Sequence, residues 1–243
     1  MDNLQLLGVQ TQRVLQRRLE TASNNLANVS TSGFKADALL TEMDARRPAR
    51  STDLPSDIRF VRDVGLARDM AQGPIAHTGE AFDVAIEGDG FFAVQAPDGA
   101  TAYTRDGSFR LDASGQLVTG AGQPVLNSGS APIVFDPQGE RPQIGADGAI
   151  SIAGVEVGKL GVFSFADPKA LEKIGDNLWS PEGQPTTEFS GTVVQGALEG
   201  SNVNPVLELT RIIEISRAYE SAARIVKNGD DLRQRTIERL GRA

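Results

Sequence analysis

The chain has 243 residues, enough for one sizeable domain or two small ones with a real hydrophobic core. Its 32 Asp and Glu exceed its 24 Lys and Arg, and this acidic balance repels the phosphate backbone of nucleic acids. The absence of cysteine excludes disulfide bonds, thiolate nucleophiles and cysteine zinc sites.

The first 30 residues predict an amphipathic helix. Small or apolar side chains recur at steps of three and four, which places them on one helical face. This face contains Leu4, Leu7, Gly8, Thr11, Leu15, Leu19, Ala22, Leu26 and Val29. Polar residues over 23–28 favour fraying and Gly33 offers a stop, so the helix should end near Ser30.

The start of the chain lacks the basic segment of an export signal. Its apolar stretches also fall short of the ~20 residues that span a bilayer. We therefore expect neither a cleaved signal peptide nor a membrane anchor.

Residues 33–77 show neither a helical nor a strand period. Arg46, Arg47 and Arg50 stand close to Pro48 and Pro55, a composition typical of an exposed segment. We expect an extended connector here.

The middle of the chain, residues 78–190, predicts an antiparallel all-β domain. Of the 26 glycines, 21 lie within residues 73–200, which indicates frequent turns. Apolar residues alternate with small or polar ones over 82–87 and again over 91–96, and Gly88-Asp89-Gly90 separates the two runs. This pattern predicts a hairpin, and later Asp-Gly and Ser-Gly pairs predict further strands joined by tight turns. We expect residues 191–204 to be a return segment, which leads the chain from the β domain back to the second helix.

Residues 205–243 predict a second, longer helix. Asn204 suits the N-cap, Pro205 suits the first helical position, and Glu208 lies near the positive end of the dipole. Steps of three and four then predict a coiled-coil seam. Gly229 costs about 1 kcal/mol relative to alanine, so we expect a kink or fraying beyond it. The seam contains Leu209, Ile212, Ser216, Tyr219, Ala223, Val226, Asp230, Arg233, Ile237 and Leu240.

Such a helix of some 35 residues extends ~50 Å, which is more than a small β domain needs for cover. Its seam favours pairing with the N-terminal helix and, beyond it, with the helices of other copies. A helical hairpin within a monomer stays open as the alternative.

The sequence offers no catalytic, cofactor-binding or metal site. His77 is the only histidine, so it has no second histidine or cysteine for a metal site or a Ser-His pairing. Glu87 and Asp89 are better explained as acidic residues of a turn than as the catalytic carboxylate pair of a glycosidase, because such a pair needs a cleft. Gly88-Asp89-Gly90 lacks the third glycine and the following helix of a phosphate-binding loop. We predict a protein that is not an enzyme and uses no cofactor.

The first helix ends in the run Asn24-Asn25-Leu26-Ala27-Asn28-Val29-Ser30-Thr31-Ser32-Gly33-Phe34-Lys35. This run resembles the N-terminal signature of the flagellar basal-body rod and hook family. Residues 78–92 and 103–109 are similar to the family's β domain, and residues 196–205 and 216–220 are similar to its C-terminal signature. The resemblance spans nearly the whole chain and is strongest to the proximal-rod members, because distal-rod members usually carry a longer segment after the first helix.

The resemblance implies a structural axial subunit of an α+β fold. Residues 1–32 and 205–243 are expected to pair as a coiled-coil-like axial domain, with the connector and the β domain forming an outer layer that transmits torque. The implied route is export through the flagellar type III apparatus without signal cleavage, then assembly in the periplasmic part of the basal body. The implied partners are copies of the chain and neighbouring proximal-rod and distal-rod subunits, with neither nucleic acid nor membrane insertion.

The resemblance also implies structural and assembly roles for particular residues. These are Asn25, Asn28, Gly33, Phe34, Arg217, Tyr219 and Glu220, beside the helix-face residues Leu4, Leu7, Leu15, Ala22, Leu26, Val29, Leu209, Ile212, Ala223 and Val226.

Two alternatives stay open. One is a distal-rod or hook-like axial subunit. The other is a carbohydrate-binding or carbohydrate-active extracellular β domain on a coiled-coil stalk, although one Trp and two Tyr provide few rings for sugar stacking.

Overall fold

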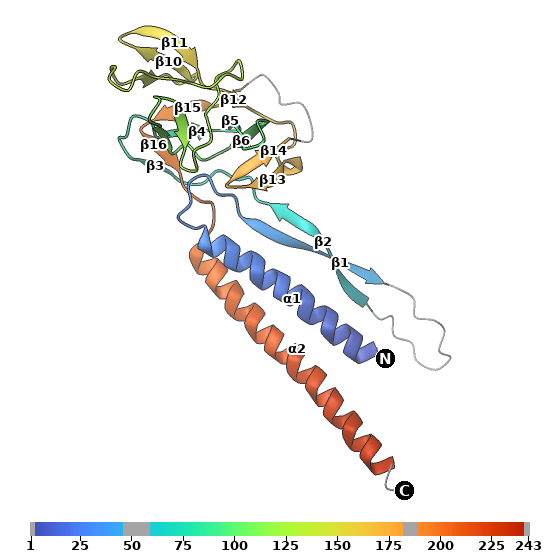
Figure 1. The fold of residues 1–243 in the computed structure, drawn as a ribbon. Helices are drawn as coiled ribbons and strands as arrows, with labels where there is room; N and C mark the ends of the chain where they lie inside the picture. The colour runs from blue at the N-terminus through green and yellow to red at the C-terminus, as the bar shows by residue number, and fades with distance from the viewer. Residues whose placement is uncertain (1–2, 46–58, 182–188, 241–243) are drawn as a thin grey trace. The chain divides into compact units, whose positions relative to one another are not determined.

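A computed structural model describes residues 3–45, 59–181 and 189–240. A helix opens the chain, antiparallel β structure fills the middle and a second helix closes it, so the fold is α+β as expected (Figure 1). Contacts within the chain divide it into two units. We call residues 1–27, 37–68 and 204–243 the helical unit, and residues 28–36 and 69–203 the β unit.

Two helices dominate the helical unit. Helices α1 (Asn3–Ala27) and α2 (Pro205–Leu240) pack against each other in antiparallel directions (Figure 1). The predicted N-cap is confirmed, because Asn204 Oδ1 accepts from the backbone N–H groups of Val206 at 3.1 Å and Leu207 at 3.2 Å. Within the described residues, neither helix is long and apolar enough to cross a membrane.

Helix α2 runs without a break through Gly229, so the predicted interruption does not end it. A single glycine costs about 1 kcal/mol, and the helical hydrogen bonds and packing on either side of it offset that amount.

A β ribbon occupies much of the predicted connector. Strands β1 (Asp37–Ala45) and β2 (Arg59–Arg68) pair antiparallel, and the ribbon packs against α1. Their register shifts between the pairs Leu40–Gly65 and Thr41–Asp63. A bulge of this kind breaks the alternation of a strand, which explains why the sequence shows no clean period here.

The β unit contains short antiparallel strands and one 3-10 turn, η1 (Pro168–Ala170). Its largest sheet has five strands in the order β12-β5-β6-β14-β13, and a three-stranded sheet has the order β11-β10-β9. The pairs β15-β4, β16-β3 and β7-β8 complete it. The strands are β3 (Ile75–His77), β4 (Val84–Glu87), β5 (Phe91–Gln95), β6 (Thr101–Thr104), β7 (Phe109–Leu111), β8 (Leu117–Thr119), β9 (Gln143–Ile144), β10 (Ala149–Ile152), β11 (Val155–Lys159), β12 (Val162–Phe163), β13 (Glu172–Gly175), β14 (Leu178–Ser180), β15 (Thr192–Gln195) and β16 (Ala197–Glu199).

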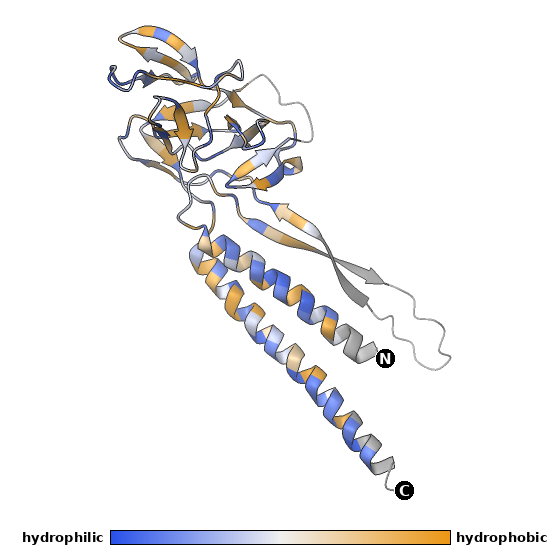
Figure 2. Cartoon of the chain, in the orientation of Figure 1, coloured by the Kyte–Doolittle hydropathy of each residue, from blue (hydrophilic) through white to orange (hydrophobic). Residues whose placement is uncertain are grey.

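Two apolar clusters hold the β unit together, and Figure 2 shows hydrophobic residues on its strands. The larger cluster includes Val84, Phe92 and Leu117. The smaller one surrounds Trp179, which is fully buried, and Tyr103.

The predicted hairpin across Gly88-Asp89-Gly90 is wrong. Strand β4 pairs with β15, and β5 pairs with β6 and β12. The glycines do mark a turn, but a turn sequence does not specify which strand lies opposite, and β15 is about 100 residues away in the chain. The tight turns predicted at Asp98-Gly99, Ser114-Gly115 and Asp147-Gly148 are confirmed, since each joins two paired strands. The turn predicted at Asp106-Gly107 does not join a hairpin, because it lies between β6 and β7, which pair with other strands.

Candidate assembly site

Three segments of the β unit that lead to or from the helical unit lie side by side. They are residues 33–36, 69–74 and 199–203. Backbone hydrogen bonds join them, from Gly33 N to Glu199 O at 2.8 Å, from Asp69 N to Ala36 O at 2.9 Å and from Gly200 N to Pro74 O at 2.8 Å. We call the polar side chains Lys35, Arg105, Glu199 and Asn202 in and around these segments the polar junction.

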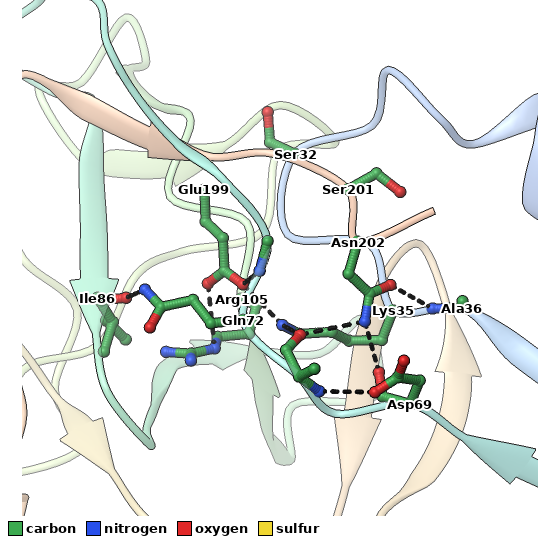
Figure 3. A network of polar contacts seen from close by, with 12 residues as sticks. Ser32, Lys35, Ala36, Asp69, Gln72, Ile86, Arg105, Glu199, Ser201 and Asn202 are labelled. Atoms are coloured by element: carbon green, nitrogen blue, oxygen red, sulfur yellow. Dashed lines mark hydrogen bonds and ion pairs between the residues drawn. The ribbon is translucent and has the colours of Figure 1, made fainter. Parts of the chain in front are cut away.

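Glu199, at the end of β16, is the centre of the polar junction (Figure 3). Its Oε1 accepts from Lys35 Nζ at 2.6 Å and from Gly73 N at 2.9 Å, and its Oε2 lies 3.3 Å from Arg105 Nε. The side chains of Lys35 and Glu199 are each 1% exposed and that of Arg105 is 4% exposed. One carboxylate therefore balances two cations that are removed from water.

The two cations also bind backbone carbonyl oxygens. Lys35 Nζ donates to Ala71 O at 2.7 Å, and Arg105 Nη2 donates to Gly88 O at 2.6 Å. Burial lowers the pKa of Lys35 and that of Arg105, while the charge of Glu199 opposes both shifts. Glu199 thus stabilises the protonated form of both partners.

Asn202 joins all three segments through its amide. Its Oδ1 accepts from Ala36 N at 2.8 Å, and its Nδ2 donates to Asp69 O at 2.8 Å and to Ala71 O at 3.1 Å (Figure 3). One side chain thereby satisfies backbone groups of the two other segments.

Gly33 and Gly73 allow the segments to approach this closely. Gly33 has φ +65°, and a Cβ there would lie 2.4 Å from the carbonyl carbon of Arg105. A Cβ on Gly73 would lie 2.1 Å from Gly200 O. Both positions therefore require glycine. Beside Gly33, Phe34 is buried, with Lys173 Nζ 4.3 Å from its ring centroid.

In the helical unit, Asn25 attaches the ribbon to α1. Its Nδ2 donates to Asp37 O at 2.8 Å and its Oδ1 accepts from Asp37 N at 3.0 Å. Asn25 is 1% exposed, so this double hydrogen bond is shielded from water.

The helices approach closely where Gly8 of α1 faces Val226 of α2. A Cβ on Gly8 would lie 2.3 Å from Val226 Cγ2. Ile212, Ser216, Ala223, Val226 and Asp230 of the predicted seam are less exposed than their neighbours on the outer face.

Leu209 and Tyr219 of the predicted seam are exposed, whereas Glu208 is buried. Apolar residues lie on more than one side of α2, so spacing alone does not predict which of them are covered within one copy of the chain.

The remaining predicted residues fall into four groups. Leu15, Leu26, Asn28 and Val29 are partly buried, Ala22 is buried, and Arg217 and Glu220 are exposed. Leu4, Leu7, Arg233, Ile237 and Leu240 lie in the helices, with side chains outside the described part.

Sequence reasoning missed the roles of Lys35, Arg105, Glu199 and Asn202. All four lie within the runs that carry the family resemblance, yet Lys35 and Glu199 are 164 residues apart. A charged residue beside apolar ones in the predicted return segment, as in Leu198-Glu199, was the available signal. This signal indicates that the charge is buried, but it does not identify the residue that pairs with it.

Comparisons with known proteins match both ends and the middle of the chain. Residues 8–35 match the family described as flagella basal body rod protein. Residues 85–152 match the flagellar hook protein FlgE/F/G D1 domain, and residues 194–239 match the flagellar basal body rod FlgEFG protein C-terminal family.

Similar relatives extend over almost the full length. The chain is 42% identical to the flagellar basal-body rod protein FlgF of Caulobacter vibrioides, over 100% of this chain and 99% of the relative. It is 34% identical to FlgF of Mesorhizobium japonicum, over 97% and 96% of the two chains. It is 33% identical to the flagellar basal-body rod protein FlgG of Bacillus subtilis, over 95% and 96%.

Proposed function

The chain belongs to the family of flagellar basal-body rod proteins, and from this premise we propose that it builds the proximal rod through contacts between its terminal helices. It is a structural subunit and not an enzyme. The observation that carries the proposal is the match to FlgF of Caulobacter vibrioides along the whole chain.

The terminal helices form the axial part of the subunit in this proposal. The close approach of Gly8 and Val226 supports a coiled-coil-like pairing of α1 and α2. The other sides of both helices then contact neighbouring subunits, which are copies of this chain and other axial proteins.

The β unit forms the outer layer and transmits torque. The polar junction supports this role. It holds together three segments of the β unit, and each of these segments leads directly to or from the helical unit.

The chain reaches the periplasm through the flagellar type III export apparatus and keeps its N-terminus. Mass spectrometry of the chain in purified basal bodies tests this part, and removal of an N-terminal leader would contradict it.

Deletion of residues 205–240 tests the function as a whole. In a strain whose only copy carries this deletion, we expect loss of motility and basal bodies without a completed rod, while the full-length copy restores both. Motile cells with the deletion would contradict a rod function.

The chain is similar to FlgG as well as to FlgF rod proteins, and the distal rod is a second candidate position. Gold labelling of the chain in isolated basal bodies separates the two positions along the rod.

A further inference from the structure

Arg105 connects the polar junction to a small cavity in the β unit. Its Nε lies 3.3 Å from Glu199 Oε2, and its Nη2 donates to Gly88 O at 2.6 Å. The third nitrogen, Nη1, is buried and has no hydrogen-bond partner among the described residues. Figure 3 shows the outer nitrogens of this guanidinium pointing away from Glu199. A buried donor without an acceptor is costly, so a ligand that accepts from Nη1 is favoured.

The cavity beside Arg105 has a volume of about 10 Å³, which admits one guest of roughly the size of a water molecule. Two of its walls are the rings of Phe91 and Phe165, which meet edge to face with their centroids 5.6 Å apart. The Arg105 Cζ lies 5.6 Å from the centroid of the Phe91 ring. The other lining residues are Met70, Asp89, Gly90 and Pro168. A guest therefore meets mostly apolar walls and one charged donor.

Positive charge is in excess among the buried groups around this cavity. Lys35 and Arg105 are both buried, and Glu199 is the buried carboxylate that pairs with them. Asp69 and Asp89 also act on these cations, but both are exposed, so water screens their charge. Burial lowers the pKa of Arg105, and the charges of Glu199 and Asp89 only partly offset this shift.

We propose that the cavity beside Arg105 binds one monatomic anion, chloride at physiological salt, which accepts a hydrogen bond from Nη1. A water molecule would accept the same hydrogen bond but would bring no charge to an interior with an excess cation. Phosphate, sulfate and organic acids are too large for the cavity. The ion then supplies the polar junction with a second negative charge beside Glu199. This proposal goes beyond the rod function and does not depend on it.

Asp89 distinguishes an anion from a water molecule. Its exposed carboxylate lines the cavity and repels an anion there. Asp89→Asn should therefore tighten chloride binding by about threefold, the effect of one charge at several ångströms in water. The matched control is Glu87→Gln, which removes an exposed carboxylate two positions away that does not line the cavity. It should leave chloride affinity nearly unchanged.

The direct test is the ³⁵Cl NMR line width of chloride in a solution of the full-length chain. We expect excess broadening that saturates as chloride rises to about 150 mM and that bromide reverses by competition. Urea unfolding, followed by the emission maximum of Trp179, should show the same affinity. As chloride replaces gluconate at constant ionic strength, the unfolding equilibrium constant should fall about tenfold once chloride reaches ten times its Kd. In crystals soaked with bromide, an anomalous peak should lie beside Arg105 Nη1.

Several results would overturn the proposal. Line widths without saturable broadening would mean that the cavity holds only water. Equal affinities of Asp89→Asn and Glu87→Gln would place the bound chloride elsewhere, as would a bromide peak remote from Arg105. Arg105→Lys removes Nη1 and should abolish binding, and a folded Arg105→Lys protein with unchanged affinity would exclude the site. If this variant does not fold, the comparison of Asp89→Asn with Glu87→Gln still decides.

Discussion

Two cations and one carboxylate share the interior of the polar junction, and this imbalance makes Glu199 the residue on which the other two depend. Lys35 and Arg105 are almost fully buried, so neither can recover its hydration if Glu199 loses its charge. A buried ion pair adds little net stability, but removal of one partner leaves a buried charge without compensation.

Glu199→Gln should lower the free energy of unfolding by about 3–5 kcal/mol. The glutamine keeps the size of the side chain, but its neutral amide compensates neither cation, and its NH₂ group faces Lys35 or Arg105 as a second donor. Urea unfolding followed by Trp179 fluorescence measures the change, because this single tryptophan is buried in the β unit.

The matched control is Glu172→Gln, which removes an exposed carboxylate of the same unit. It should change stability by less than about 0.5 kcal/mol. Equal losses for the two variants would mean that Glu199 has no special role in the junction.

At the scale of elements, features specified by neighbouring residues could be predicted and those specified by distant residues could not. The Asn204 cap and the Asp-Gly turns depend on side chains within four positions of the backbone they bind. The β4–β15 pair, the ribbon bulge and the Lys35–Glu199 pair depend on partners elsewhere in the chain. The helical seam lies between these cases, because spacing predicted a stripe on α2 but not the side that meets α1.

The contact between the helices is tested at Gly8. In an isolated helix Gly8→Ala would add about 1 kcal/mol of stability. Here the added Cβ meets the stiff, branched side chain of Val226, so we expect a loss of stability instead. A second substitution, Val226→Ala, should remove the clash, so that Gly8→Ala stabilises the protein when it is added to the Val226→Ala variant. Thermal melts of the four proteins of this cycle, followed by circular dichroism at 222 nm, measure the coupling. Additive effects of the two substitutions would show that the helices do not meet at this point.

At the scale of the whole molecule, charge is divided between the two units. The β unit carries 18 Asp and Glu against seven Lys and Arg, and so has 11 excess acids. The helical unit carries 14 Asp and Glu against 17 Lys and Arg, and so has three excess bases. The overall charge of −8 therefore comes from the β unit alone.

This division predicts that salt strengthens self-association. Acidic β units of neighbouring copies repel each other over a Debye length of ~30 Å at 10 mM ionic strength, which falls to ~8 Å at 150 mM. Sedimentation velocity across this range should show larger assemblies as salt rises. A control with Glu80→Gln, Asp98→Asn, Glu140→Gln and Glu156→Gln should depend less on salt. Assemblies that dissociate on addition of salt would indicate that attraction between the oppositely charged units dominates.

The chain passes between its two units four times, at residues 27–28, 36–37, 68–69 and 203–204. A domain attached by one linker has a single covalent connection to its neighbour, whereas these two units are connected four times. The polar junction ties together the segments behind three of these crossings, so that a load on any one of them is shared by its neighbours. A pull on the helical unit therefore reaches the β unit through four stretches of backbone, and cleavage of any one of them leaves three.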